Sequence, residues 1–200
     1  MVIIGLCGSS GAGKGYVCEK FARYGVGFID TDLVYRERVL VNPSCVNELV
    51  SSFGYGILEN GYVSKKRLAA IVFEGEGFEK RLSTLNQITH KYIRIETDLL
   101  IAFHRENGFS AVLVDAPVLF ESGFDKMCDV TVCVTAPYGE KLDRIMKRDG
   151  ISREKAEARL CAQLSDDILR EKCTYELDNT NGADLDGQIL SILASIGIPN

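Results

Sequence analysis

Residues 2–14, VIIGLCGSSGAGK, decide the fold of this 200-residue chain. The first half is short, apolar and rich in β-branched residues, which predicts a buried β-strand over residues 2–7. The second half, Gly8 to Lys14, has the spacing G-x-x-x-x-G-K and opens a helical pattern. A glycine-rich turn between a strand and a helix N-terminus presents backbone N–H groups that attract phosphate. We predict a nucleotide phosphate site here, with the Lys14 ammonium on the β- and γ-phosphates; the alternative is a plain connecting turn.

The residue after the lysine departs from the usual pattern. Ser or Thr commonly stands there and binds magnesium through its hydroxyl, whereas this chain has Gly15 followed by Tyr16. Phosphate binding through backbone groups and Lys14 should persist, but ligation of magnesium by a hydroxyl is in question. The predicted nucleotide-binding residues of the loop are Gly8, Gly11, Ala12, Gly13, Lys14, Gly15 and Tyr16.

Further apolar runs predict strands at 26–29, 111–114, 130–134 and 175–177. Helical sequence separates most of them, and alternating strands and helices favour a parallel sheet covered on both faces. The long interval before residue 111 predicts a helical insert, since it exceeds an ordinary loop. Its main helix should bury one apolar face, and a turn-rich connection, residues 52–68, should precede it. The predicted face consists of Phe78, Leu82, Leu85, Ile88, Tyr92, Ile95 and Leu99.

Composition excludes several classes of protein. Lys plus Arg is 23 and Asp plus Glu is 28, giving a net charge of −5, which argues against coating of DNA or RNA. Seven scattered cysteines without a C-x-x-C pair favour reduced thiols and a cytoplasmic location over a disulfide framework or a zinc site. The N-terminus reads as a strand rather than a signal peptide, and no stretch approaches the roughly 18 apolar residues of a membrane span.

Acidic residues follow two of the predicted strands. Asp30 and Asp32 follow the run 26–29, and Asp115 follows 111–114. Ligands of open parallel sheets bind at the carboxyl ends of the strands. Asp30 or Asp32 is suited to accept a proton from a substrate hydroxyl or to hold magnesium, while helix capping is the alternative. Asp115 is predicted to act on magnesium through an oxygen or a water, with loop capping as its alternative.

Basic residues cluster later in the chain. Arg144 and Arg148 are four residues apart, so they share a helical face. Guanidinium groups neutralise a phosphoryl group in transfer through paired hydrogen bonds. Arg159 and Gln163 form a second pair of the same spacing. Residues 140–172 are dense in both signs of charge, so surface ion pairs on a solvated face are the alternative.

Two histidines lie in the predicted long helix. His90 is beside the apolar face, where a histidine is more often a structural residue than a catalyst. His104 is expected to face solvent. The residues alone therefore give neither histidine a chemical role.

Taken in order, these motifs resemble those of dephospho-CoA kinases along nearly the whole chain. GSSGAGKG resembles the phosphate loop, and its Gly-Lys-Gly core also resembles that of adenylate kinases. FIDTD resembles the Asp-x-Asp element, and ITHKYI the His-Pro motif, with Lys91 where proline is usual. VDAPVLFE, DRIMKRDGISREKAEARLCAQ and LDNTNG resemble the segment after the third strand, the lid and a C-terminal asparagine turn.

The resemblance implies an α/β, P-loop three-layer fold with a five-stranded parallel sheet, a helical substrate-side insert and a helical lid. Residues 1–32, 109–139 and 173–200 would form the nucleotide-binding core, 33–108 the CoA-side insert and 140–172 the lid. The implied reaction phosphorylates the 3′-hydroxyl of dephospho-CoA with ATP and Mg2+. We expect a monomer or small homo-oligomer without nucleic-acid or membrane partners.

The resemblance also implies residue roles. Asp32 would be the base, Lys14 the phosphate clamp and Arg144 a lid cation. The nucleotide would further contact Arg148 and Asn179, the latter beside the adenine. Substrate-binding residues would be Asp32, His90, Asp115 and Arg159. Two alternatives remain open: a catalytically weakened ATP-binding module, which Gly15, Tyr16 and Lys91 suggest, and another nucleotide or metabolite kinase of the same fold.

Overall fold

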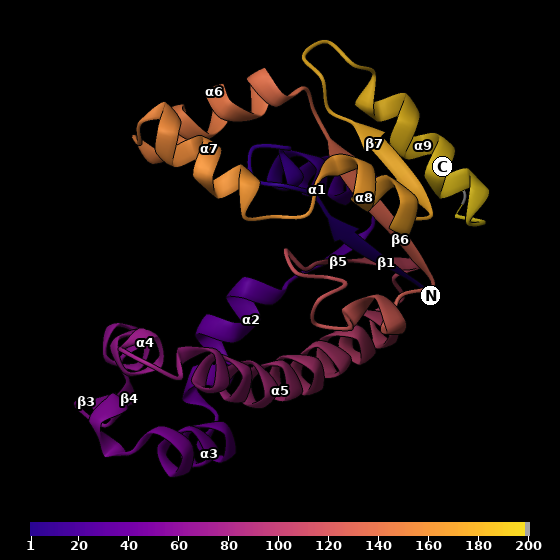
Figure 1. Ribbon diagram of the computed structural model, residues 1–200. Helices are drawn as coiled ribbons and strands as arrows, with labels where there is room; N and C mark the ends of the chain where they lie inside the picture. The colour runs from indigo at the N-terminus through magenta and orange to yellow at the C-terminus, as the bar shows by residue number, and fades with distance from the viewer. Residues whose placement is uncertain (199–200) are drawn as a thin grey trace. The chain divides into compact units, whose positions relative to one another are not determined.

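The structure is a computed structural model that describes residues 1–198 (Figure 1). The chain forms two compact units. The first comprises Met1–Ile29 and the chain from Phe103 onward, and the second comprises Asp30–Ala102. Residues 140–172 fall within the first unit. Among the described residues, no helix combines the length and apolar character needed to cross a membrane.

A five-stranded sheet organises the first unit, in the order β2-β5-β1-β6-β7. The β1–β5, β1–β6 and β6–β7 pairings are all parallel. This confirms the predicted α/β fold, and every predicted strand is present. The strands are β1 (Val2–Cys7), β2 (Gly27–Asp30), β5 (Ala111–Asp115), β6 (Val130–Thr135) and β7 (Tyr175–Asp178).

Side chains on the two faces of β1 meet different partners because successive residues of a strand alternate. Ile4 and Leu6 are completely buried in the core formed with helices α1 (Lys14–Arg23) and α9 (Leu185–Ser195). Gly5 points to the opposite face, where an added Cβ would meet Cys128 and Leu119. The phosphate loop thus starts from a strand that is held firmly on both sides.

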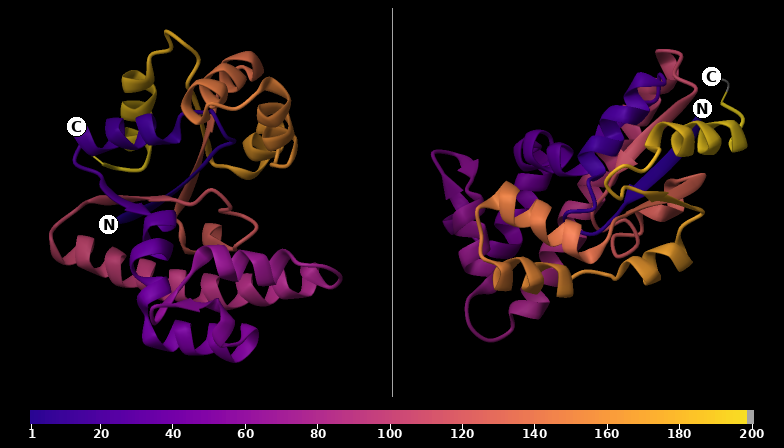
Figure 2. Two further views of the ribbon diagram at one scale, coloured as in Figure 1. Left: turned by 90° about the vertical axis from the view of Figure 1, so that its left-hand side faces the viewer. Right: turned by 90° about the horizontal axis from the view of Figure 1, so that it is seen from above.

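Three helices follow β6: α6 (Tyr138–Asp149), α7 (Arg153–Cys161) and α8 (Asp166–Lys172). Helices α6 and α7 lie side by side around a small core of their own (Figure 2). Gly150 ends α6 in the left-handed conformation, at φ 62°. The Ser165 side chain caps α8 by accepting a hydrogen bond from the backbone N–H of Ile168. The core of the α6–α7 pair consists of Leu142, Ile145, Ala156 and Leu160.

The second unit is mainly helical, as predicted, but it also contains a hairpin that we did not predict. A two-residue turn joins its strands, with Asn60 at φ 52° and Gly61 at φ 84°. Asn-Gly is the favoured sequence for such a turn, so residues 60–61 did indicate a hairpin. The elements are α2 (Thr31–Glu37), η1 (Val39–Val41), α3 (Pro43–Phe53), η2 (Tyr55–Ile57), β3 (Leu58–Glu59), β4 (Tyr62–Val63), α4 (Lys65–Phe73) and α5 (Phe78–Glu106), which belongs to this unit as far as Ala102.

Helix α5 exists as predicted, but its buried face is only partly the predicted one. Ile88 and Tyr92 are buried, whereas Ile95 and Leu99 are 44% and 58% exposed. In this half of the helix Ile101 is buried instead. Periodicity identifies an amphipathic helix, but the elements that pack against it decide which side is covered.

The expectation for His104 was wrong. The ring is half-buried and lies against Gly27 of β2, where an added Cβ would come within 2.8 Å of its Nδ1 atom. The ring of Phe109 packs edge-on against it, with 4.9 Å between centroids. Gly27 in the strand leaves room for the imidazole of His104. The sequence of the helix alone does not reveal this packing partner.

Candidate active site

The loop between β1 and α1 requires glycine at two positions. Gly11 and Gly13 have φ values of 79° and 92°, in the left-handed region that other residues avoid. A Cβ at Gly11 would also collide with the carbonyl oxygen of Lys141, and one at Gly13 with the side-chain nitrogen of Asn179. Backbone strain and close packing therefore both exclude larger residues there.

An open cavity of about 770 Å³ lies over this loop, within the first unit. It brings together the loop, Asp115 and two arginines that were proposed from separate parts of the sequence. Lys147, which sequence reasoning missed, adds a further cation. The lining residues are Gly8, Ser9, Ser10, Gly11, Gly13, Lys14, Gly15, Asp115, Pro117, Arg144, Lys147, Arg148 and Gln163.

Lys14 and Asp115 form an ion pair in this cavity. The Lys14 Nζ atom lies 3.8 Å from Oδ1 of Asp115, and each side chain is 17% exposed. They meet because β5 runs beside β1, with Asp115 paired with Leu6. A carboxylate at the end of β5 and an ammonium at the start of α1 are the groups that a metal-bound polyphosphate needs.

The donor set fits magnesium shared with phosphate. Mg2+ is usually held by one or two carboxylates together with phosphate oxygens and water, and Asp115 supplies such a carboxylate. Gly15 and Tyr16 supply no aliphatic hydroxyl. Across the described residues, no group of three or more His, Cys, Asp or Glu side chains could hold a metal by itself.

Arg144 is fixed against the back of the loop. Its Nη1 atom lies 3.4 Å from the carbonyl oxygen of Gly11. Its Nη2 atom donates to Glu140 and to the carbonyl of Asn179, both at 2.8 Å. This guanidinium reaches the cavity in an orientation set by the protein, so little ordering remains when an anion binds.

Asn179 is a structural support of the loop in this arrangement. Its side chain is buried, and its Nδ2 atom donates to the carbonyl of Ala12 at 2.7 Å. Its backbone N–H donates to Thr135 at the end of β6, at 2.8 Å. The predicted contact with adenine stays a prediction.

Arg148 and Arg159 share one carboxylate. Arg148 donates through Nε and Nη2 to the two oxygens of Asp149, each at 2.8 Å, and Arg159 also contacts Oδ2. The hydrogen bonds from Arg148 lower the pKa of Asp149. Arg148 lines the cavity. Arg159 is absent from its lining among the described residues and makes the kind of surface ion pair that the charge density indicated.

Tyr16 also lies outside the lining of the cavity. Its side chain is 49% exposed, with the Lys20 ammonium 5.6 Å from its ring centroid.

A buried polar cluster beside the loop was missed. Lys141 Nζ donates to Ser9 Oγ at 3.1 Å and to Asp166 at 2.8 Å, and Ser9 Oγ donates to Asp166 at 2.9 Å. The charge density predicted a solvated face here, yet Lys141 is only 7% exposed. The available signal was its spacing from Arg144 and Arg148, which puts all three on one side of α6.

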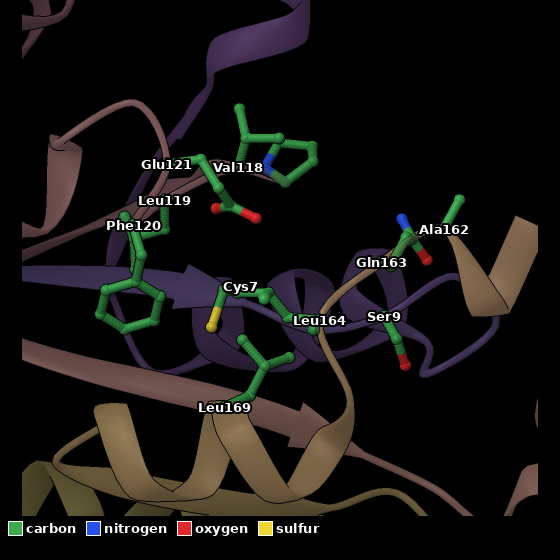
Figure 3. Close-up of a pocket in the computed structure, with 12 residues that line it drawn as sticks. Cys7, Ser9, Val118, Leu119, Phe120, Glu121, Ala162, Gln163, Leu164 and Leu169 are labelled. Carbon is green, nitrogen blue, oxygen red and sulfur yellow. The ribbon is translucent and has the colours of Figure 1, made fainter.

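A smaller pocket of about 90 Å³ adjoins the cavity (Figure 3). The two share Gly8, Ser9, Pro117 and Gln163. Figure 3 shows side chains from the β1 end, from the segment after β5 and from the connection between α7 and α8 converging around it. Gln163 Oε1 accepts a hydrogen bond from the backbone N–H of Ser10 at 2.8 Å.

The two remaining candidates, Asp32 and His90, belong to the second unit. The Asp30 carboxylate caps α2, accepting from the N–H groups of Asp32 and Leu33 at 2.8 and 3.0 Å, which confirms capping for Asp30. The Asp32 carboxylate, in the first turn of α2, is exposed. His90 is half-buried, and this burial lowers its pKa.

Lys91, which stands where the resembling motif has proline, has a structural partner. Its ammonium donates to Glu48 of α3 at 2.6 Å. The hydroxyl of Tyr92 donates to the same carboxylate oxygen at 2.7 Å, and the bond from Lys91 lowers the pKa of Glu48. The substitution therefore adds an ion pair between α5 and α3.

Comparisons with known proteins show the family of this chain. The sequence profile of the family "Dephospho-CoA kinase" matches residues 2–184. The chain is 36% identical over 172 residues to a dephospho-CoA kinase from Bacillus cereus, covering 86% of this chain and 83% of that protein. A solved protein from Thermus thermophilus superposes with a TM-score of 0.80 at 28% identity, covering 98% and 97% of the two chains. The solved dephospho-CoA kinase from Campylobacter jejuni superposes with a TM-score of 0.68 at 26% identity, covering 97% and 96%. The family prediction is confirmed: this chain belongs to the dephospho-CoA kinase family.

Proposed function

We propose that this kinase transfers the γ-phosphate of ATP to the 3′-hydroxyl of dephospho-CoA, giving CoA and ADP. The observation that carries the proposal is the cavity in which the loop, the Lys14–Asp115 pair and the α6 arginines meet. Loop N–H groups and Lys14 would hold the β- and γ-phosphates. Arg144 and Arg148 would neutralise charge on the phosphoryl group as it moves.

Asp32 would take the proton from the 3′-hydroxyl as its oxygen attacks the γ-phosphorus and the bond to ADP breaks. Asp115 would hold Mg2+ directly or through water, and the ion would supply neutralisation of phosphate charge. His90 and Arg159 would bind dephospho-CoA, with Asn179 beside the adenine. In this proposal residues 33–108 carry the acceptor, and residues 140–172 close as a lid that excludes water.

The decisive experiment is a coupled assay of ADP release with ATP, Mg2+ and a panel of acceptors. We expect turnover with dephospho-CoA and only background release with AMP or other nucleoside monophosphates. Transfer to a nucleoside monophosphate at a higher kcat/KM than to dephospho-CoA would show the substrate assignment to be wrong. ATP binding without turnover on any acceptor would favour the weakened ATP-binding module.

The missing hydroxyl after Lys14 gives a separate prediction. A Cβ added at Gly15 meets no described atom within 4 Å beyond its immediate neighbours, so serine fits there. We expect Gly15→Ser to lower the Mg2+ concentration for half-maximal activity about tenfold, the effect of one added ligand contact to a charge. Magnesium titration of the ADP-release rate measures this.

Gly139→Ser is the matched control for that variant. Gly139 is the second residue of α6, as Gly15 is of α1, and it too has open space around it. Both changes improve helix propensity equally. An identical magnesium response in the two variants would exclude a ligand role for position 15.

We also propose that the reaction takes place in the cytoplasm, in a monomer or small homo-oligomer. The cysteines support the location. Cys45 and Cys133 are buried, and burial raises the pKa of Cys45 to about 11, so this thiol stays protonated at neutral pH. Such thiols suit a reducing compartment.

A further inference from the structure

Lys141 carries a buried charge, and its two hydrogen-bond partners are also hydrogen-bonded to each other. Its ammonium donates to Ser9 Oγ and Asp166 Oδ2, and Ser9 Oγ donates to the other oxygen of Asp166. The side chains of Lys141 and Asp166 are 9% and 13% exposed. The three residues, called here the Ser9–Lys141–Asp166 triangle, join the phosphate loop to α6 and α8.

Such a triangle contributes little net free energy to folding. Desolvation of two charges offsets most of their attraction, and well-packed apolar residues commonly stabilise a fold as well or better. What directional hydrogen bonds add is a defined relative position of the groups they join. The triangle is therefore better suited to fixing geometry than to supplying stability.

The geometry that it fixes includes the cations of the cavity. Lys141, Arg144 and Arg148 are spaced three and four residues apart on α6, so they lie along one side of the helix. The backbone of Lys141 also packs directly on Gly11 of the loop. A shift of Lys141 would therefore displace both arginines relative to the phosphate loop.

The connection between α7 and α8 adds a second attachment. Gln163 accepts from the N–H of Ser10, and Asp166, three residues later, accepts from Ser9. Two adjacent loop residues are thus bonded to one short segment. The loop, α6 and this segment form a connected polar assembly within the first unit.

We propose that Lys141 is a positioning residue. Together with Ser9 and Asp166 it fixes α6 over the phosphate loop, so that Arg144 and Arg148 meet the transferring phosphoryl group at the correct place. The inference rests on the proposed function for the identity of the reaction, but nucleotide binding tests it independently of any acceptor.

The test compares Lys141→Met with the double variant Lys141→Met/Asp166→Leu. The single change leaves Asp166 buried without its cation, so it should lower the melting temperature and reduce kcat about 100-fold, as expected for misplaced catalytic groups. The double change removes both charges. It should recover the melting temperature while kcat stays about 100-fold reduced.

Two measurements separate this role from a structural one. Calorimetric titration with MgADP should show weakened binding in both variants, even if dephospho-CoA proves to be the wrong acceptor. If the double variant recovers kcat together with its melting temperature, Lys141 contributes only to folding and the proposal is overturned. Unchanged MgADP affinity and unchanged kcat in a folded single variant would overturn it as well.

Asp186→Asn is the matched control. Asp186, away from the cavity, also accepts from a lysine and a hydroxyl: from Lys20 and, at 2.9 Å, from Tyr24, although its side chain is more exposed, at 45%. We expect this variant to lower the melting temperature while kcat and MgADP affinity stay at wild-type values. Loss of kcat in this control equal to that in Lys141→Met would attribute both losses to general destabilisation and would overturn the positioning role.

Discussion

Replacing Asp32 with Asn is expected to lower kcat about 1,000-fold, within the range of about 100- to 10,000-fold for loss of a general base. Asparagine keeps the size and polarity of the side chain but cannot accept the proton of the attacking hydroxyl. The Asp32 carboxylate is exposed in the first turn of α2. Steady-state ADP release at saturating ATP and dephospho-CoA measures the effect.

MgATP affinity distinguishes loss of the base in Asp32→Asn from misfolding of the variant. The nucleotide cavity is lined by residues of the first unit, whereas Asp32 belongs to the second, so MgATP affinity should stay within about twofold of wild type, a change below about 0.5 kcal/mol. Asp30→Asn is the matched control, because asparagine caps a helix as well as aspartate does. Wild-type kcat in Asp32→Asn would assign proton removal to another group.

Replacing Lys14 with Met is expected to lower kcat/KM about 1,000-fold, the effect of removing a strong electrostatic contact from a transition state. The ammonium pairs with Asp115 at 3.8 Å in a cavity where both side chains are largely covered. Methionine fills the same space without charge, so the γ-phosphate loses its clamp and Asp115 loses its cation. Both kcat and MgATP affinity should fall.

The control for Lys14→Met is Lys20→Met on the same helix. Lys20 pairs with Asp186 of α9, and that hydrogen bond raises the pKa of Lys20. Its loss should lower the melting temperature and leave MgATP affinity unchanged. MgATP binding at wild-type affinity in Lys14→Met would show that the loop does not hold the triphosphate as proposed.

Local patterns in the sequence were enough to predict the strand, loop and helix at the N-terminus. The glycine and lysine spacing of Gly8 to Lys14, between an apolar strand and a helix, is a local pattern that can be recognised without knowing its distant partners. The five strands were likewise recognisable, since continuous apolar runs such as 111–114 are buried from both sides of a parallel sheet. The order of all the motifs indicated the dephospho-CoA kinase family, which the comparisons confirm.

Other features depended on partners that are remote in the chain. Ser9 and Lys141 are 132 residues apart, yet they share a hydrogen bond. The spacing of Lys141 from Arg144 and Arg148 puts it on their side of α6, but the local sequence does not show that its ammonium is buried. In the same way, Asn179 supports Ala12 across 167 residues.

The sequence by itself thus determined the five strands of the sheet, the phosphate loop and the family, because those follow from short-range spacing and apolar patterning. Only the tertiary structure decided which side of α5 is buried, why His104 is covered, and which of the charges in residues 140–172 turn inward. Burial and pairing of a charge depend on what the rest of the chain brings next to it.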